Sequence, residues 1–205
     1  MLPFLQGLER LSNNFNIYYS TFYDNHGLKN TLETDLTHTK EKRQIIYIGA
    51  HGDVGEIAGD EASVAMKLIS KFGEKIEGVI LSCCYVGKNR GILKRACSYN
   101  RFSDTYGANW LFGYKYAVDW IPSMMIDLAI LEHVFMQDRL IEKDKIINSF
   151  TEALTLFNKD FEVATDVNEE PRKLLESIKL IIRGKTATTP IDVTANLLIN
   201  LNWNK

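Results

Sequence analysis

Two residues in the first half of the chain carry side chains that together could catalyse nucleophilic attack. His51 follows the apolar segment 44–50, and Cys84 ends a second apolar stretch that begins at 77. A free cysteine has a pKa of roughly 8.5, and a nearby imidazole raises its thiolate fraction or accepts its proton during attack. Either residue alone at a strand end is common, so the signal depends on the pair.

The segments before His51 and Cys84 have the continuous apolar character of strands that are covered on both faces. The two residues are 33 positions apart (84 − 51), about one strand–helix–strand unit, which predicts that the strands are neighbours. Ligands of parallel α/β sheets bind beyond the carboxyl ends of the strands. We therefore expect the imidazole and the thiol at the same edge of a parallel sheet.

The rest of the chain supplies the other elements of an α/β fold in one domain, residues 1–205. Apolar patterns predict strands over 16–23, 44–50, 77–83 and 109–115, and helices over 60–73, 89–97, 120–136 and 143–161. In the first of these helices, Asp60 is the expected N-cap, and the core-facing stripe is expected to be Val64, Leu68 and Phe72.

The C-terminal part, residues 143–205, is expected to be a helical elaboration of the same domain. A helix is predicted over 171–183, starting at Pro171. From Ile191 to Trp203 apolar residues alternate with mostly polar ones, which favours a late strand, although a helix fits so short a segment as well.

Composition excludes several classes of protein. The formal charge is −2, which gives no argument for binding nucleic acid or a membrane surface, and no apolar run approaches the ~20 residues of a membrane span. The N-terminus lacks the features of a signal peptide. Two of the three cysteines, Cys83 and Cys84, are adjacent, which disfavours disulfides and favours a reducing, cytoplasmic compartment.

Other uses of these residues fit less well. A zinc site would need His51 with Cys83, Cys84 and Cys97, but vicinal cysteines rarely bind one metal and no Cys-x-x-Cys spacing is present. A nucleophile elbow of the α/β-hydrolase type requires glycine two places before the nucleophile, where this chain has Ser82. No Gly-rich phosphate loop occurs, and we expect no metal and no cofactor.

Three segments resemble the caspase-like superfamily of cysteine peptidases, and most closely its CHAT (caspase–HetF-associated with TPRs) branch. Ile45–Asp53 (IIYIGAHGD) resembles the block that ends in His-Gly, and Val79–Gly87 (VILSCCYVG) resembles the block that carries the nucleophile. Trp110–Trp120 (WLFGYKYAVDW) resembles a third block, a strand before a Val-Asp pair. The resemblance covers about residues 14–136 and implies a three-layer αβα sandwich with a mostly parallel central sheet.

The resemblance also implies roles for individual residues. Cys84 takes the nucleophile position and Cys83 the small-residue position before it, so Cys83 is the minor alternative. The backbone N–H groups of Gly52 and Cys84 would bind the oxyanion, and His51 would act on the leaving group. Asp119 would line a pocket for a basic substrate residue, or cap the helix ahead of Pro122. Asp53, in an acidic loop with Glu56 and Asp60, would shape the pocket or form a solvated turn.

These features together predict a cysteine endopeptidase that cuts a protein or peptide substrate through His51 and Cys84. Relatives of this type are often fused to domains that switch them on, so we expect control by a separate protein partner. A bacterial signalling or antiviral defence system is the expected setting. The alternative is a caspase-like interaction module without turnover.

Overall fold

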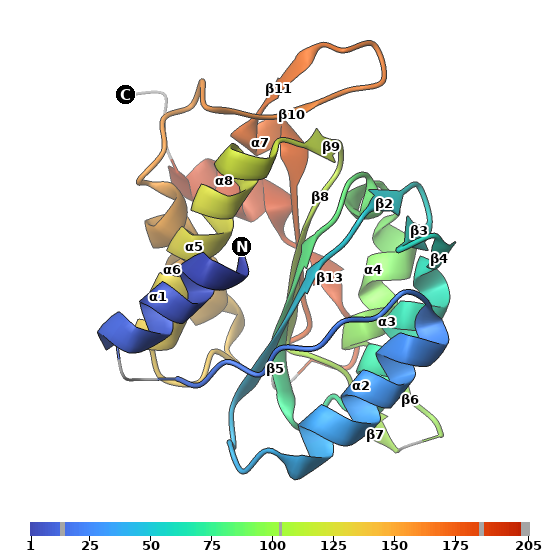
Figure 1. Ribbon diagram of the computed structural model, residues 1–205. Coiled ribbons are helices and arrows are strands. Elements are labelled where there is room, and N and C mark those ends of the chain that lie inside the picture. The colour runs from blue at the N-terminus through green and yellow to red at the C-terminus, as the bar shows by residue number, and fades with distance from the viewer. Residues whose placement is uncertain (13–14, 103, 185–186, 202–205) are drawn as a thin grey trace.

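The computed structural model describes residues 1–12, 15–102, 104–184 and 187–201 (Figure 1). Its centre is a five-stranded sheet in the order β1-β5-β8-β12-β13. These strands are β1 (Gln44–Gly49), β5 (Ile76–Ser82), β8 (Trp110–Tyr114), β12 (Ile178–Ile182) and β13 (Ile191–Asp192). β1, β5 and β8 run parallel, whereas β12 and β13 join antiparallel. The sheet is therefore mixed, with its parallel part formed by the first half of the chain.

Helices cover both faces of this sheet and make a three-layer α/β arrangement (Figure 1). One face carries α2 (Asn25–His38), α3 (Ala62–Lys71) and α4 (Arg90–Cys97). The other carries α1 (Leu2–Ser12), α5 (Trp120–Met136), α6 (Lys143–Leu154) and α8 (Thr194–Leu201). Each face has its own core: in β5, Ile80 packs in the core of the α5 side, and Val79 and Leu81 pack in the core of the α3 side. Burial on both faces explains the continuous apolar run in β5.

Short strands and turns complete the structure around the sheet. One small sheet follows β1 and consists of β2 (Gly52–Asp53), β3 (Glu56–Ile57) and β4 (Asp60–Glu61). Another contains β9 (Ala117–Val118), β10 (Glu162–Thr165) and β11 (Pro171–Lys173), and β6 (Tyr99–Asn100) pairs with β7 (Thr105–Tyr106). A 3-10 turn, Val86–Lys88, precedes α4, and a single helical turn, α7 (Leu174–Ser177), precedes β12.

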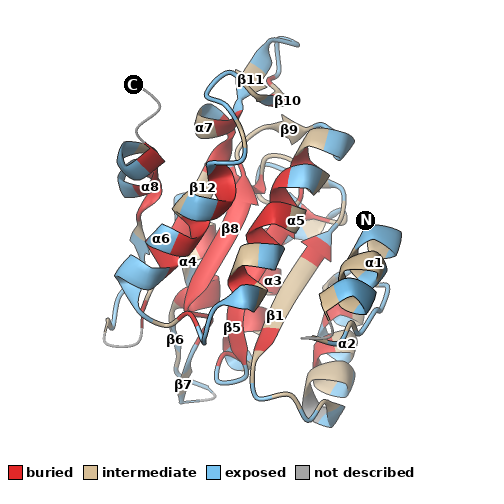
Figure 2. Cartoon of the chain, turned by 90° about the vertical axis from the view of Figure 1, so that its left-hand side faces the viewer, coloured by how far each residue is buried: buried red, intermediate tan, exposed pale blue. Residues whose placement is uncertain are grey.

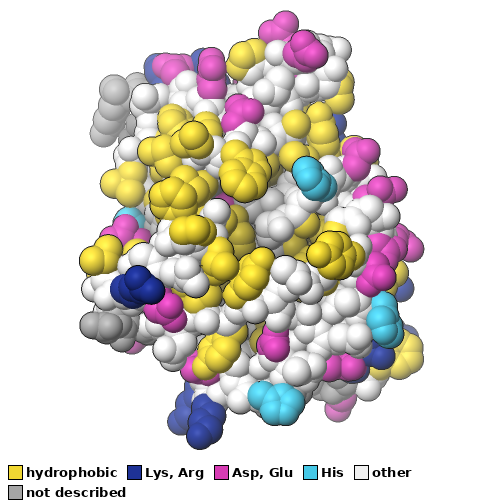
Figure 3. All heavy atoms as spheres, in the orientation of Figure 1, with side chains coloured by type: hydrophobic (Ala, Val, Ile, Leu, Met, Phe, Trp, Pro, Cys, Tyr) yellow, Lys and Arg dark blue, Asp and Glu magenta, His cyan; other side chains and the backbone are white. Residues whose placement is uncertain are grey.

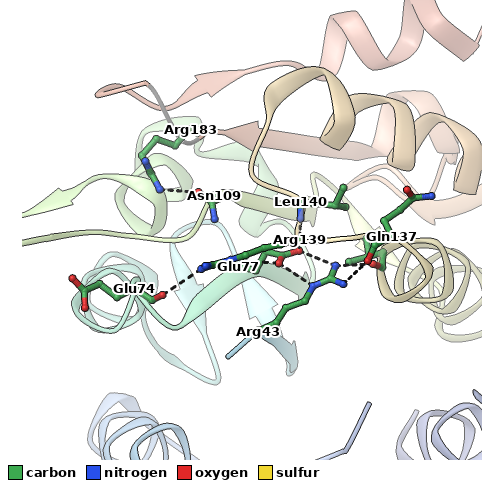
Figure 4. A network of polar contacts seen from close by, with 9 residues as sticks. Arg43, Glu74, Glu77, Asn109, Gln137, Arg139, Leu140 and Arg183 are labelled. Carbon is green, nitrogen blue, oxygen red and sulfur yellow. Dashed lines mark hydrogen bonds and ion pairs between the residues drawn. The ribbon is translucent and has the colours of Figure 1, made fainter. Parts of the chain in front are cut away.

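An ion-pair network holds the end of the sheet that lies away from the ends of β1 and β5 (Figure 4). The Glu77 carboxylate, fully buried near the start of β5, accepts two hydrogen bonds of 2.9 Å from the Arg43 guanidinium. The guanidinium also donates to the carbonyl oxygens of Val134 and Gln137 at the end of α5. The Leu140 N–H donates to the same carboxylate at 3.0 Å. This network fixes β5 and the C-terminal end of α5 relative to each other.

The structure confirms the strands predicted over 44–50, 77–83 and 109–115 and the helices predicted over 89–97 and 120–136. Asn89 caps α4, since its side chain accepts from the Ile92 N–H at 3.1 Å. The helix predicted over 143–161 is present but shorter, because α6 ends at Leu154.

Other sequence predictions were wrong. Residues 16–23 form no strand. Helix α3 begins after Glu61, so Asp60 is not its cap, and its buried face is formed by Ala62, Ala65, Met66 and Ile69 instead of the predicted stripe Val64, Leu68 and Phe72. The Asp60 carboxylate instead accepts from the Asn25 N–H at 2.9 Å, which ties this turn to α2.

In the C-terminal part, the helix predicted over 171–183 was wrong, and the stretch from Ile191 follows mainly the helical alternative to the favoured strand. Residues 171–183 are not a continuous helix: they form β11, one helical turn and β12, an inner strand of the central sheet. The predicted late strand from Ile191 is mostly helix α8, and Trp203 lies outside the described residues. The C-terminal part is therefore not wholly helical, because it supplies two strands to the main sheet.

Candidate active site

His51 and Cys84 follow the ends of two strands that are directly paired. β1 and β5 are parallel, with Gly49 opposite Ser82 at their last position, so each candidate residue lies two positions beyond a matched pair. Both residues line one cavity of about 1130 Å³, which runs along β1, the edge strand of the sheet. Figure 2 shows β1 less buried than β5 and β8, consistent with the open space beside it. The structure thus brings the predicted imidazole and thiol to one cavity.

The cysteine lies on a tight turn between β5 and α4. Tyr85, directly after it, adopts a left-handed backbone with φ of 61°, which is unfavourable for a bulky residue. Two hydrogen bonds hold this turn: Tyr85 N–H donates to the Tyr116 carbonyl at 3.1 Å, and Val86 N–H donates to the Cys84 carbonyl at 2.8 Å. Lys88 lies 4.6 Å from the Tyr85 ring centroid and reinforces the turn. The Cys84 backbone is therefore held in one conformation.

The two adjacent cysteines have different environments, and this separates their roles. Cys83 is fully buried, and its thiol lies 3.6 Å from the Ile48 carbonyl oxygen, within β1. Burial raises the pKa of the Cys83 thiol to about 12, so it is protonated at neutral pH. Cys84 is partly exposed and lines the cavity. Of the two thiols, that of Cys84 is therefore accessible from the cavity and that of Cys83 is not.

His51 is exposed at the rim of the same cavity. Its carbonyl oxygen accepts from the Ala58 N–H at 2.8 Å, which closes the β2–β3 hairpin and fixes the backbone. Within the described ranges, the His51 imidazole makes no hydrogen bond to a protein group. The imidazole is therefore available to a ligand in the cavity, and among the residues that the structure describes none orients it as the third member of a triad would.

Gly52 lies directly against the backbone of Cys84. A side-chain carbon at this position would be 2.5 Å from the Cys84 carbonyl oxygen and 3.1 Å from its nitrogen, so only glycine fits. The Cys84 N–H donates to no acceptor among the residues that the structure describes. An unpaired N–H beside the nucleophile is the kind of donor that an oxyanion hole requires.

The two predicted substrate-binding carboxylates belong to residues close in sequence to residues that line the cavity. Neither carboxylate is itself part of the lining. Asp119 is exposed at the N-cap position of α5, where its side chain makes no capping hydrogen bond. Its neighbours Val118 and Trp120 do line the cavity. Asp53 is exposed on β2, and its carboxylate accepts from the Val54 N–H at 2.6 Å. The part of the lining contributed by α5 is apolar or hydroxylated: Trp120, Ser123, Met124, Leu131 and Phe135.

One buried acid near this site was not anticipated from the sequence. Asp127 of α5 is fully buried and accepts hydrogen bonds from the Tyr114 hydroxyl at 2.7 Å and from the Tyr47 hydroxyl at 3.0 Å. The Ser82 hydroxyl lies near this carboxyl group and favours its ionised form. Burial raises the pKa of Asp127 to about 6, although the three hydroxyls act in the opposite direction. The available signal was an acidic residue within the apolar stretch 120–131 of a core helix.

Comparisons with known proteins found no family model, no curated protein and no solved structure that matches this chain. Among the described residues, no group of His, Cys, Asp and Glu side chains is arranged to hold a metal ion. In the same part of the chain, every helix is too short or too polar to cross a membrane.

Proposed function

We propose that this chain is a cysteine endopeptidase with a caspase-like architecture, in which Cys84 is the nucleophile and His51 the acid–base group. One observation carries the proposal: an accessible thiol and an imidazole, each two residues beyond paired ends of parallel strands, line one cavity. The three sequence blocks that resemble the caspase-like superfamily include both strand ends and the segment that leads into α5. The mixed sheet between two helical layers is compatible with that architecture.

The proposed reaction follows from the groups at the site. His51 accepts the proton of the Cys84 thiol as the sulfur attacks the scissile carbonyl carbon, and the negative charge on the carbonyl oxygen is stabilised by the N–H groups of Cys84 and Gly52. His51 gives a proton to the leaving amine as the C–N bond breaks, which leaves a thioester on Cys84. Water, deprotonated by His51, then attacks the thioester, releases the acid product and restores the thiol.

A basic residue before the scissile bond is the proposed specificity. Asp53 and Asp119 are exposed carboxylates next in sequence to Gly52 and to the lining residues Val118 and Trp120. A substrate Arg or Lys could pair with either carboxylate when the peptide lies across the cavity mouth. The proposal also includes activation by a separate protein partner.

A positional-scanning peptide library, with and without the protein encoded beside this chain, tests the function. We expect cleavage by the wild type and none by Cys84→Ala or His51→Ala, while circular dichroism shows that both variants remain folded. Asp119→Asn and Asp53→Asn should lower the preference for basic residues without abolishing cleavage. Undiminished cleavage by Cys84→Ala would refute the assignment.

The second candidate is a caspase-like interaction module without turnover. The observation that favours it is a set of exposed apolar side chains on the first turns of α5: Trp120 is 82% exposed, Ile121 66% and Met125 47%. Figure 3 shows hydrophobic side chains gathered over this helix. Exposed apolar patches of this kind often mark contacts between proteins. Under this alternative, a thiol-directed peptidyl probe would leave Cys84 unlabelled even with the partner present.

A further inference from the structure

The buried carboxylate of Asp127, on helix α5, faces three strands of the central sheet. The Tyr114 hydroxyl from β8 donates to one carboxylate oxygen at 2.7 Å, and the Tyr47 hydroxyl from β1 donates to the other at 3.0 Å. The Ser82 hydroxyl, at the end of β5, lies near both this carboxyl group and the Tyr47 hydroxyl and lowers the pKa of each. A single acidic side chain is therefore hydrogen-bonded to β1 and β8 and faces the end of β5.

Two of these hydroxyls belong to the strands that carry the candidate catalytic residues. Ser82 lies two positions before Cys84, and Tyr47 lies four positions before His51. Both Ser82 and Tyr47 line the same cavity as the dyad. A change in the hydrogen bonds at Asp127 would therefore shift the ends of β1 and β5, which lead directly into His51 and Cys84.

A fully buried acid without a basic partner is costly, and hydrophobic packing alone would have been served by an apolar residue. Among the described residues, the Asp127 carboxyl group contacts hydroxyls and no Lys or Arg side chain. Two hydroxyl donors, one on each carboxylate oxygen, hold an ionised carboxylate in one orientation without neutralising its charge. These contacts indicate a role beyond filling space in the core.

We propose that Asp127 is a positioning residue, whose ionised carboxylate holds the carboxyl ends of β1 and β5 in a fixed relation so that His51 and Cys84 face the same part of the cavity. The catalytic consequence of this coupling rests on the proposed function, whereas the coupling itself does not. Protonation of Asp127 converts an acceptor into a donor and forces at least one hydroxyl to reverse or break its hydrogen bond.

The groups that face Asp127 do not themselves change charge near neutral pH, so the titration of Asp127 can be told apart from theirs. Tyr47 from β1 and Tyr114 from β8 both have a raised pKa because of burial and the nearby carboxylate, so their hydroxyls remain protonated. The Cys83 thiol after β5, which is also influenced by Asp127, remains protonated. Helix α6, packed against α5, brings no charged side chain to this carboxyl group in the described part of the chain. Asp127 is thus the group in this cluster that changes charge near neutral pH.

Amide chemical shifts measured by NMR between pH 4.5 and 8 test the coupling without any need for catalysis. The experiment uses the His51→Ala protein, in which the imidazole cannot contribute a titration. We expect the amides of Gly49, Gly52 and Cys84 to titrate together with a midpoint close to the pKa of Asp127, which is about 6.

Added substitutions identify the group responsible for that titration. Asp127→Asn should abolish it, and Tyr114→Phe should move its midpoint to higher pH, because the Tyr114 hydrogen bond lowers the pKa of Asp127. Tyr116→Phe is the matched control and should leave the midpoint unchanged. Reporter amides that do not titrate, or that keep the same midpoint in both Asp127→Asn and Tyr114→Phe, would overturn the proposal.

Labelling of Cys84 by a peptidyl acyloxymethyl ketone, in protein that retains His51, extends the test to the proposed function. The rate should fall on the acid side of its pH profile, and Tyr114→Phe should move that fall to higher pH. A purely structural role would lower the rate equally at every pH, and that result would overturn the proposal. A wild type that is not labelled at all would contradict the proposed function, while the amide titration would still decide the role of Asp127.

Discussion

Gly52 lies so close to Cys84 that a side-chain carbon on the glycine would approach the cysteine carbonyl oxygen to 2.5 Å. This contact joins the hairpin after β1 to the turn after β5, and so joins the segments that carry the imidazole and the thiol. The Cys84 atoms nearest to Gly52 belong to the backbone, so they cannot move aside as the end of a flexible side chain can. The contact therefore makes the relation between the two segments sensitive to a single methyl group.

Gly52→Ala should displace the Cys84 turn. We expect a loss of about 1–3 kcal/mol in the free energy of unfolding, as for other overpacked sites. Labelling of Cys84 by an active-site probe should slow roughly 100-fold, since displacement by about 1 Å can have that effect. Gly7→Ala is the matched control, because a side-chain carbon at Gly7 meets no atom within 4 Å and α1 should tolerate it. Equal behaviour of the two variants would contradict the close contact.

The three cysteines should differ sharply in their reaction with iodoacetamide. Burial raises the pKa of Cys83 and of Cys97 to about 12, and neither thiol is accessible. At pH 8 a thiol with that pKa is thiolate in roughly one molecule in 10,000. Mass spectrometry of the native protein should therefore find Cys84 alkylated and the other two unmodified. In guanidinium chloride all three should react alike, and early modification of native Cys83 would argue against the assignment of the nucleophile.

The pKa of Asp127 predicts a pH dependence of stability. Its pKa is raised from 3.8 to about 6 in the folded chain, so the folded state binds this proton more tightly than the unfolded state. The contribution to stability is fully present below about pH 4 and is lost as the pH rises through 6, a change of about 3 kcal/mol. Urea unfolding of wild type and Asp127→Asn from pH 4 to pH 7.5 measures it. A stability difference that does not vary with pH would exclude this titration.

Much of the parallel half of the fold was predictable from local sequence. The strands that end before His51 and Cys84 are continuous apolar runs. Burial on both faces produces that pattern in β5, whereas β1 is only partly buried and contacts both helical layers from the edge of the sheet. The C-terminal half was not predictable in the same way. Ile178 and Ile182 have the spacing of a helix face, but they belong to an inner strand whose burial on both faces also produces an apolar run. The pairing of β12 with β8, which is distant in sequence, decides in favour of a strand over a helix.

The candidate site was predictable only where its residues lie at strand ends. His51 and Cys84 follow motifs that topology brings together, so the sequence identified the pair. Asp127 was not identified, because its partners Tyr47 and Tyr114 come from separate strands and no local spacing links them. Helix α8 was only the alternative prediction for a related reason: Leu197 and Leu201 are buried on one face, but the alternating residues around them also fit a strand.

Arg43→Ala should reduce stability without disturbing the site. The substitution leaves the buried Glu77 carboxylate with the Leu140 N–H at 3.0 Å and a longer ion pair with Arg139 at 3.8 Å. Removal of one partner of a buried pair typically costs about 3–5 kcal/mol. Folded Arg43→Ala protein should still label at Cys84, since the pair lies near the opposite end of β5. Lys145→Ala, which removes an exposed pair with Glu142, is the control and should change stability by less than about 0.5 kcal/mol. Thermal unfolding compares the two.

Covalent labelling by a peptidyl acyloxymethyl ketone with a basic terminal residue, located by mass spectrometry, shows whether Cys84 is the nucleophile. We expect wild type, in the presence of its partner, to carry the label on Cys84. Cys84→Ala should carry none, and His51→Ala should react far more slowly although it remains folded. A label on Cys83, or equal labelling of wild type and His51→Ala, would contradict the account.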